Sequence, residues 1–240
     1  MTLYVGTSGW AYKEWKPDFY PQDVPQSKFL EYYAQTLGAC EINATFYRLQ
    51  SDTTFNRWLS FTPENFRFST KAHRRLTHSR NMAPDAEARG FLDMFLKSVG
   101  MLGPRLGAIL FQFPPRRERD DHQLAGLLEA LPAGTPYAFE FRHESWNVSE
   151  VRERIARTNS TVCVSNTDGT VPDVLPPGPI AYCRLRTDRY SEEAREGWRQ
   201  LLQREAKERP VFAFTKHEGI PAGDPYGGIG LAKWLAGEVG

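Results

Sequence analysis

Carboxylates and cations lie at or near the ends of several short apolar runs of this sequence. Glu41 and Glu140 lie one residue before the ends of two such runs, and Lys71 directly follows a third. A carboxylate removed from water beside a cation can act as a general acid or base, or it can form a structural ion pair. Both interpretations stay open for the two glutamates. Lys71 could form a Schiff base if burial and neighbouring cations lower its pKa, but an anion-binding ammonium group is favoured.

The runs that carry these residues are rich in β-branched and aromatic residues, which is typical of strands. Strands are predicted at residues 3–7, 40–42, 66–70, 106–112, 137–141, 161–165, 180–185 and 211–214. Helical patterns lie between most of them, at residues 27–37, 52–60, 84–101, 120–131, 149–158, 191–207 and 228–236. Ser27 is the expected N-cap of the first helix, and Pro84 is expected in the first turn of the third. Residues 168–179 contain too many prolines for a regular helix, so the helical unit between strands six and seven is expected to be degenerate.

Alternating strands and helices predict an α/β fold with a mostly parallel sheet. Eight such units in 240 residues fit a closed barrel, for which ~250 residues is typical. A doubly wound open sheet is the alternative, but it normally has a glycine-rich phosphate loop. The segment GTSG at 6–9 lacks the spacing of that loop. We therefore predict one (β/α)8 TIM-barrel domain over residues 1–240.

The composition is that of an ordinary globular protein, with 40% hydrophobic and 25% charged residues. The formal net charge of +1 does not indicate a nucleic-acid or acidic-membrane partner. No stretch approaches the roughly 20 apolar residues of a membrane helix, and the first residues lack signal-peptide features, so we expect a cytoplasmic protein without a membrane partner. Cys40, Cys163 and Cys183 lie far apart in apolar runs, which predicts buried thiols rather than disulfides.

In a barrel, functional side chains lie at the C-terminal ends of the strands and in the loops that follow. These positions are unusually polar here, and ionised groups are seldom buried without partners, which favours a bound ligand over an ion-pair network alone. The expected ligand-contacting residues are Ser8, Trp10, Asn43, Tyr47, Gln112, Arg142, His143, Trp146, Asp168, Arg184 and Lys216. The other aromatic residues of the first loop are expected to form a hydrophobic plug.

Two segments favour an anionic ligand. Residues 71–80, KAHRRLTHSR, are strongly basic, although a solvated loop would have the same composition. The glycine-rich residues 219–230 lead into the last helix, whose N-terminal N–H groups could bind a phosphate, although turns use glycine as well.

A metal site has no local ligand motif in this sequence. His143 and His217 could combine with Glu140, Glu218 or Asp168, because a barrel brings ligands together from separate strands. No spacing supports this set, so no cofactor and no metal ligand is assigned, and a divalent ion stays an alternative.

Several motifs resemble those of the domain of unknown function 72 family, also called YecE-like proteins. They occur in order along almost the whole chain, as GTSGW at 6–10, FYP at 19–21, EINATFYRL at 41–49, TPENFRFSTKAHRRLTH at 62–78, LFQFPP at 110–115 and FEFRHESW at 139–146. The resemblance implies a TIM-barrel fold. It also implies a shared pocket, with an unnamed ligand, near Glu41, Asn43, Tyr47, Lys71, Gln112, Glu140, Arg142 and His143.

Near its C-terminus the chain departs from that family's pattern. It reads RLRT at 184–187 where the family has R-L-H-G, and FTK at 214–216 where the family often has F-N-N. These differences imply a more cationic rim on this side of the barrel.

Together, these features predict an enzyme that binds a small anionic, phosphate-bearing ligand. Glu140 or Glu41 would act as acid or base, while Lys71, Arg142 and Arg184 hold the anion. The reaction class would be that of a hydrolase, lyase or isomerase with a phosphorylated substrate. The alternatives are a metal-dependent phosphoester hydrolase and a nucleic-acid-binding or adaptor protein that uses the basic run at 71–80.

Overall fold

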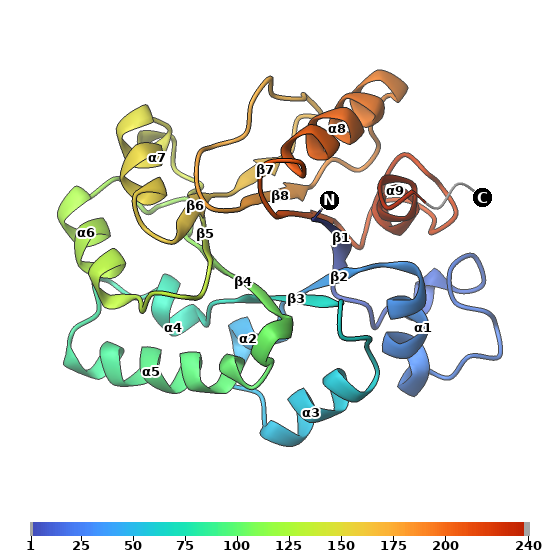
Figure 1. Cartoon of the computed structure of the whole chain (residues 1–240), viewed down its shortest axis with the longest axis horizontal. Helices are drawn as coiled ribbons and strands as arrows, with labels where there is room; N and C mark the ends of the chain where they lie inside the picture. The colour runs from blue at the N-terminus through green and yellow to red at the C-terminus, as the bar shows by residue number, and fades with distance from the viewer. Residues whose placement is uncertain (1, 238–240) are drawn as a thin grey trace.

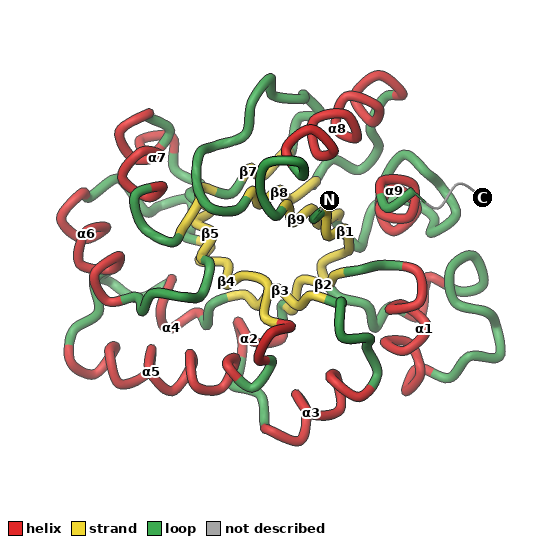
Figure 2. Tube along the Cα trace, in the orientation of Figure 1, coloured by secondary structure: helices red, strands yellow, loops and turns green. Residues whose placement is uncertain are grey.

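The computed structural model describes residues 2–237, in which parallel strands form a central ring with helices around it (Figure 1 and Figure 2). The strands are β1 (Leu3–Ser8), β2 (Ala39–Ile42), β3 (Arg67–Lys71), β4 (Leu106–Gln112), β5 (Tyr137–Glu140), β6 (Ser160–Val162), β7 (Val164–Asn166), β8 (Ala181–Leu185) and β9 (Val211–Thr215). Neighbouring strands are parallel, in the order β6-β5-β4-β3-β2-β1-β9-β8-β7.

The ring closes through one strand position that is divided in two. β6 pairs with β5, whereas β7 pairs with β8. Only Cys163 separates the two segments, and its N–H donates to the carbonyl oxygen of Phe139 on β5 at 2.9 Å. The nine segments therefore fill eight strand positions, which confirms the predicted (β/α)8 barrel. The expectation of one continuous strand over 161–165 is wrong, because the chain changes its pairing partner at Cys163.

All seven predicted helices are present, and their ends lie within two residues of the predicted ones. They are α1 (Phe29–Thr36), α3 (Asp52–Ser60), α5 (Ala86–Gly100), α6 (Asp121–Ala130), α7 (Ser149–Ala156), α8 (Glu192–Glu205) and α9 (Gly228–Leu235). Two single-turn helices, α2 (Ala44–Tyr47) and α4 (Arg74–Thr77), directly follow β2 and β3 and were not predicted. The proline-rich residues 167–180 form no helix in the described chain, as expected.

Side-chain caps set the starts of four of the long helices. Ser51, Asp85, Asp120 and Ser191 each accept a hydrogen bond from a backbone N–H three residues later, which satisfies a donor that the first helical turn leaves free. Two predicted starts are wrong. Ser27 lies inside a 3-10 turn (Gln26–Lys28) that precedes α1, and Pro84 precedes the cap of α5 instead of lying in its first turn.

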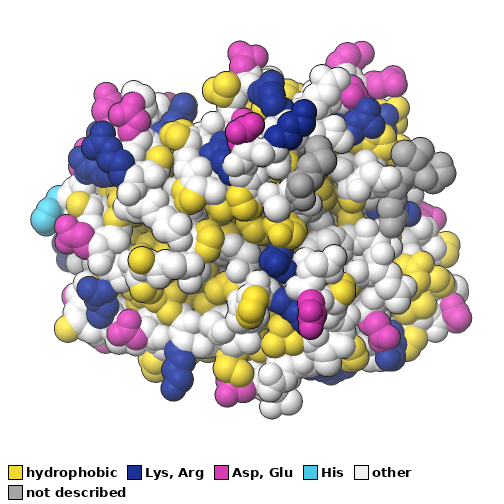
Figure 3. All heavy atoms as spheres, in the orientation of Figure 1, with side chains coloured by type: hydrophobic (Ala, Val, Ile, Leu, Met, Phe, Trp, Pro, Cys, Tyr) yellow, Lys and Arg dark blue, Asp and Glu magenta, His cyan; other side chains and the backbone are white. Residues whose placement is uncertain are grey.

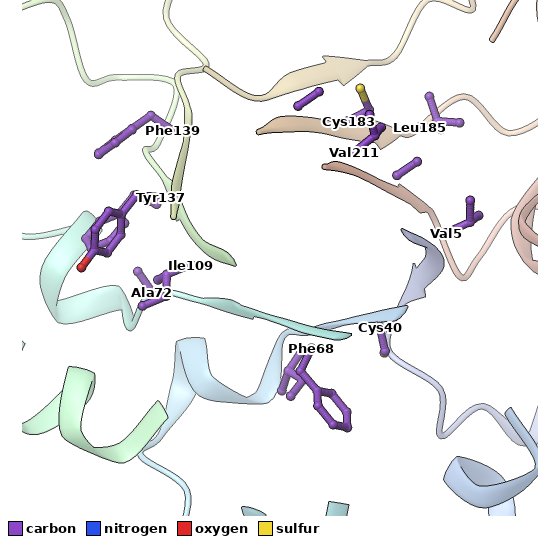
Figure 4. Close-up of a cluster of buried hydrophobic side chains, with 14 of the residues drawn as sticks. Val5, Cys40, Phe68, Ala72, Ile109, Tyr137, Phe139, Cys183, Leu185 and Val211 are labelled. Carbon is purple, nitrogen blue, oxygen red and sulfur yellow. The ribbon is translucent and has the colours of Figure 1, made fainter. Parts of the chain in front are cut away.

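Hydrophobic side chains pack on both faces of the ring. Because successive side chains of a strand point to opposite faces, every second residue faces the helices. Phe68 of β3 and Phe139 of β5 point away from the ring in Figure 4, into the core between barrel and helices. Leu110, Tyr182 and Phe214 belong to a separate buried cluster that fills the interior of the barrel.

The surface carries charges of both signs. Figure 3 shows Lys and Arg interspersed with Asp and Glu over the face in that view. Within residues 2–237, no helix combines the length and the apolarity that crossing a membrane requires.

Substitution of Gly6 tests the packing of β1 against β2. A Cβ atom at Gly6 would lie 1.8 Å from the carbonyl oxygen of Ala39 on β2, which is backbone and cannot move aside. We expect Gly6→Ala to lower the free energy of unfolding by about 3 kcal/mol, as overpacking does. Gly38→Ala is the matched control, because a Cβ there meets nothing within 4 Å. Urea denaturation measures both, and equal stabilities of the two variants would contradict the described contact.

Candidate functional site

Strand alternation places a polar layer above the apolar interior of the barrel. Glu41 of β2, Glu140 of β5 and Arg184 of β8 each come two residues after a member of the interior cluster. They therefore face the interior too, one step closer to the C-terminal ends of the strands. All three are buried, with at most 6% of each side chain exposed. The apolar filling of the barrel thus ends in a layer of charged groups.

Arg184 joins the two glutamates across the barrel. Its Nη2 donates to Oε1 of Glu41 at 2.8 Å, and its Nε donates to Oε2 of Glu41 at 3.0 Å. Its Nη1 donates to Oε2 of Glu140 at 2.7 Å. β2 and β5 are not neighbours in the sheet, so this guanidinium group connects strands that backbone pairing leaves apart.

Further donors saturate both carboxylates. Glu41 also accepts from the hydroxyl of Ser8 at 2.7 Å and from that of Tyr182 at 2.9 Å. Gln112 lies within 2.9 Å of both carboxylate oxygens of Glu140 through its Nε2, and Nε of Arg142 donates to Oε1 at 3.2 Å. The charge of each glutamate is therefore balanced by hydrogen bonds and by guanidinium groups.

The neighbouring guanidinium groups favour the ionised form of both glutamates. Burial alone would raise the pKa of Glu41, but the charges of Arg184 and Arg186 outweigh burial and lower it to about 2. At Glu140, burial again opposes ionisation, yet Arg184 and the hydrogen bond from Gln112 lower the pKa. The geometry gives both glutamates the role of holding Arg184, and their role as acid or base stays a prediction.

A cavity of about 720 Å³ lies over this layer. Most of the predicted site residues line it, namely Ser8, Asn43, Tyr47, Lys71, Gln112, Glu140, Arg142, Arg184 and Lys216. Glu41 is fully buried beside Ser8 and Arg184 and does not line the cavity. Volumes of this size are typical of sites for small molecules. The structure therefore brings the predicted catalytic and cationic residues to one place.

The two predicted tryptophans lie elsewhere. Trp10 packs edge-on against Trp58 at 5.5 Å and lines a separate hollow. Trp146 is buried, stacks on Phe141 at 4.3 Å, and donates from Nε1 to the carbonyl oxygen of Arg117 at 2.7 Å. Both side chains have packing roles outside the cavity.

His143 and Asp168 also lie outside the cavity, and both stabilise turns. Nδ1 of His143 lies 2.9 Å from the hydroxyl of Ser145, at the start of a 3-10 turn (Glu144–Trp146). Asp168 accepts from the amide of Asn166 and from the backbone N–H and hydroxyl of Thr170. Among residues 2–237, no three His, Cys, Asp or Glu side chains are grouped so that they could hold a metal ion.

Arg186, part of the segment that predicts a cationic rim but not one of the expected ligand-contacting residues, lines the cavity. It follows Arg184 by two residues, so strand alternation places it on the same face. Its Nη2 contacts Ser8 and Glu41, whereas its Nε is buried and has no hydrogen-bond partner among the described residues. Tyr12, assigned to the plug of the first loop, lines the cavity as well and stacks on His217 at 4.2 Å.

Lys71 differs from the other cations of the cavity. Its Nζ lies 4.3 Å from the ring centroid of Phe46, and it has no ion-pair or hydrogen-bond partner within residues 2–237. Burial and the charge of Arg184 lower the pKa of Lys71 to about 8, although Glu41 and Glu140 oppose this. About a tenth of this amine is therefore neutral at pH 7.

The two segments that favoured an anion lie differently from what was expected. Of the basic run at 71–80, only Lys71 lines the main cavity, while Arg74, Arg75 and His78 line a neighbouring hollow of about 670 Å³. None of residues 219–230 lines the main cavity, so the start of α9 offers no phosphate site there. Nucleic-acid binding by the basic run stays a prediction.

Comparison with known proteins identifies relatives over most of the chain. The model of a family described as protein of unknown function DUF72 matches residues 4–224. UPF0759 protein YunF of Bacillus subtilis (strain 168) is 30% identical over 149 residues, which make up 60% of this chain and 52% of that protein. UPF0759 protein YecE of Escherichia coli (strain K12) is 27% identical over 142 residues, 59% of this chain and 48% of that protein. The chain thus matches about half the length of these curated relatives.

Two solved structures have the same fold. A DUF72 family protein of Thermotoga maritima MSB8 has a TM-score of 0.76 and 23% sequence identity, and the match covers 98% of this chain and 97% of that chain. A DUF72 family protein of Enterococcus faecalis V583 has a TM-score of 0.72 and 15% identity, with 98% and 95% covered. At these identities the likeness shows the fold alone.

Glu41 should make stability depend on acid pH. Its pKa is lower in the folded chain, so its contribution is present above about pH 4.5 and is lost as the pH falls toward 2. Lowering this pKa from 4.5 to about 2 corresponds to about 3 kcal/mol. We expect Glu41→Gln to lower the free energy of unfolding by at least that much at pH 7. The loss should become progressively smaller between pH 5 and pH 2, and urea denaturation at each pH measures it.

Glu87→Gln is the control for this prediction. Glu87 pairs with Arg75 at 3.1 Å, but both side chains are exposed. Such a pair contributes about 0–1 kcal/mol. If the two variants lost equal stability at pH 7, the buried pairing of Glu41 would be refuted.

Proposed function

Because this chain belongs to the family described as protein of unknown function DUF72, we propose its function from the chemistry of its own cavity. The proposed function is that of an enzyme that binds a small organic anion at the C-terminal ends of the barrel strands. The bound group would be a carboxylate or a phosphate. The anion would bind at the cationic wall of the cavity. This wall consists of Lys71, Arg142, Arg184, Arg186 and Lys216.

The observation that carries this proposal is a set of cationic donors without acceptors. Arg184 and Arg142 contact Glu140, Arg186 contacts Glu41, and Lys216 contacts Asp188. In the described chain, this leaves Nζ of Lys71 and the buried Nε of Arg186 without partners. A buried donor without an acceptor costs about 1–3 kcal/mol. An anion in the cavity would supply the missing acceptors.

The roles of the residues follow from their contacts. Arg184 cannot move toward a ligand without breaking its bonds to Glu41 and Glu140, so it is a preorganised positive charge at the floor of the cavity. Guanidinium groups suit planar carboxylate and tetrahedral phosphate oxygens because their donors form a fixed fork. Arg186 and Lys71, with free donors, would contact the anion directly.

Inorganic phosphate is the simplest probe of this site. We expect isothermal titration calorimetry to detect phosphate binding to the parent protein. Lys71→Ala and Arg186→Gln should each weaken it at least tenfold, about 1.4 kcal/mol, because each removes an unpaired donor. Arg157→Gln is the control, since Arg157 is exposed at the C-terminal end of α7, where the chain turns toward the start of β6.

Two results would refute the anion site. One is a parent protein that binds neither phosphate nor acetate, the second probe. The other is equal phosphate affinity of the parent, Lys71→Ala and Arg186→Gln proteins.

A further inference from the structure

Lys71 has an environment in which its amine loses a proton more readily than an exposed lysine does. It is the last residue of β3, so the strand fixes its backbone, and Thr45 donates a hydrogen bond to its carbonyl oxygen at 2.8 Å. The ring of Phe46 covers one side of the amine. Arg184 and Arg142, whose charges disfavour a further cation, line the same cavity. Burial and these neighbouring cations favour the neutral amine, and they outweigh the charges of Glu41 and Glu140 and the cation–π contact with Phe46, which favour the ammonium form.

Position 71 holds a lysine, whereas most other cations of the cavity are arginines. The guanidinium groups of Arg142, Arg184 and Arg186 stay charged at every physiological pH, whereas a lysine can lose its proton. Burial and Arg184 lower the pKa of Lys71 to about 8, at which roughly a tenth of the amine is neutral at pH 7. A neutral primary amine is a nucleophile toward carbonyl carbon. Lys216 also lines the cavity, but its amine pairs with Asp188.

We propose that Lys71 forms an imine with the carbonyl carbon of a small anionic aldehyde or ketone bound in this cavity. The proposal rests on the anion site proposed above and names its substrate class, an oxo acid or a phosphorylated aldehyde or ketone. Arg186, with its unpartnered Nε, would hold the anionic group of that substrate. Lys71 would then be a catalytic residue, and Glu41 and Glu140 would position Arg184 beneath the bound molecule.

The step is balanced without an external oxidant or reductant. Nζ of the neutral amine attacks the carbonyl carbon, a C–N bond forms, and the π electrons of the carbonyl move to its oxygen. One proton moves from the nitrogen to that oxygen, which gives a carbinolamine. The C–O bond then breaks, and the hydroxyl leaves as water with the second nitrogen proton, so that a C=N bond remains. The products are the imine and one water molecule.

An imine draws electrons from the carbon next to it. That carbon can then lose a proton, or a C–C bond to it can break, and the electron pair is stored on nitrogen. The reaction class that follows from this chemistry is that of a lyase or isomerase acting beside a carbonyl group. Hydrolysis of the imine would return Lys71 to its starting state.

Reductive trapping tests the proposal on the full chain. The parent protein is incubated at pH 7 with sodium cyanoborohydride and one carbonyl probe at a time. The probes are glyoxylate, pyruvate, glycolaldehyde phosphate and the neutral propanal. Peptide mass mapping then locates the reduced adduct. We expect at least one anionic probe to modify Lys71 ten or more times faster than Lys97, which is exposed on α5. Propanal should show a smaller preference for Lys71, and inorganic phosphate should slow trapping by the anionic probe.

Two further readouts separate chemistry from charge. The rate of trapping at Lys71 should rise with pH to a midpoint near 8. Lys71→Arg should abolish the adduct at this position but keep phosphate affinity within about twofold, because the positive charge remains.

The outcomes distinguish the imine from the anion site. The imine would be overturned if adducts were spread evenly over the lysines, or if none of the four probes gave an adduct at Lys71. If phosphate still binds in that case, the anion site stands. An adduct at Lys71 that phosphate does not slow, in a protein that binds neither phosphate nor acetate, would support the imine and overturn the anion site. Absence of both would refute both proposals.

Discussion

The buried pairing of Arg184 with Glu41 and Glu140 is the interaction on which the C-terminal end of this barrel depends. Each of these groups loses most of its hydration on folding, which costs several kcal/mol per ion. Their mutual attraction offsets that cost, together with the added hydrogen bonds from Ser8 and Tyr182 to Glu41 and from Gln112 to Glu140. The pairing connects β2, β5 and β8, so the charges also fix the relative positions of strands that backbone hydrogen bonds do not join.

The properties of the cavity follow from this charged layer. Arg186 and Arg142 contact the same two carboxylates as Arg184, and these contacts hold three guanidinium groups near one another. Their combined charge attracts an anion and disfavours one more cation. Burial is the main cause of the lowered pKa of Lys71, and the charges of Arg184 and Arg142 lower it further. Anion binding and the nucleophilicity of Lys71 therefore both involve these guanidinium groups, and a variant that weakens the layer should alter both.

Much of this fold could be predicted from the sequence, because alternation and helix periodicity report which side of each element is buried. The same alternation identified Glu41, Glu140, Arg184 and Arg186 at strand ends, although Arg186 was assigned to a cationic rim and not to the ligand contacts. It could not show that one arginine bridges both glutamates, since that depends on the stagger of strands that are not neighbours. Beyond a strand end, local turns set side-chain direction, so the positions of His143 and Trp146 were not predictable.

The central claim is that Glu41 and Glu140 are both ionised beneath the cavity at neutral pH. Carboxyl carbon-13 NMR of the protein labelled at glutamate side chains measures this directly, with Glu41→Gln and Glu140→Gln spectra to assign the two signals. The account predicts carboxylate chemical shifts for both residues at pH 7, and for Glu41 no midpoint above about pH 3 while the chain stays folded. A midpoint above pH 5 for either residue would show a protonated glutamate beside Arg184 and would contradict the account.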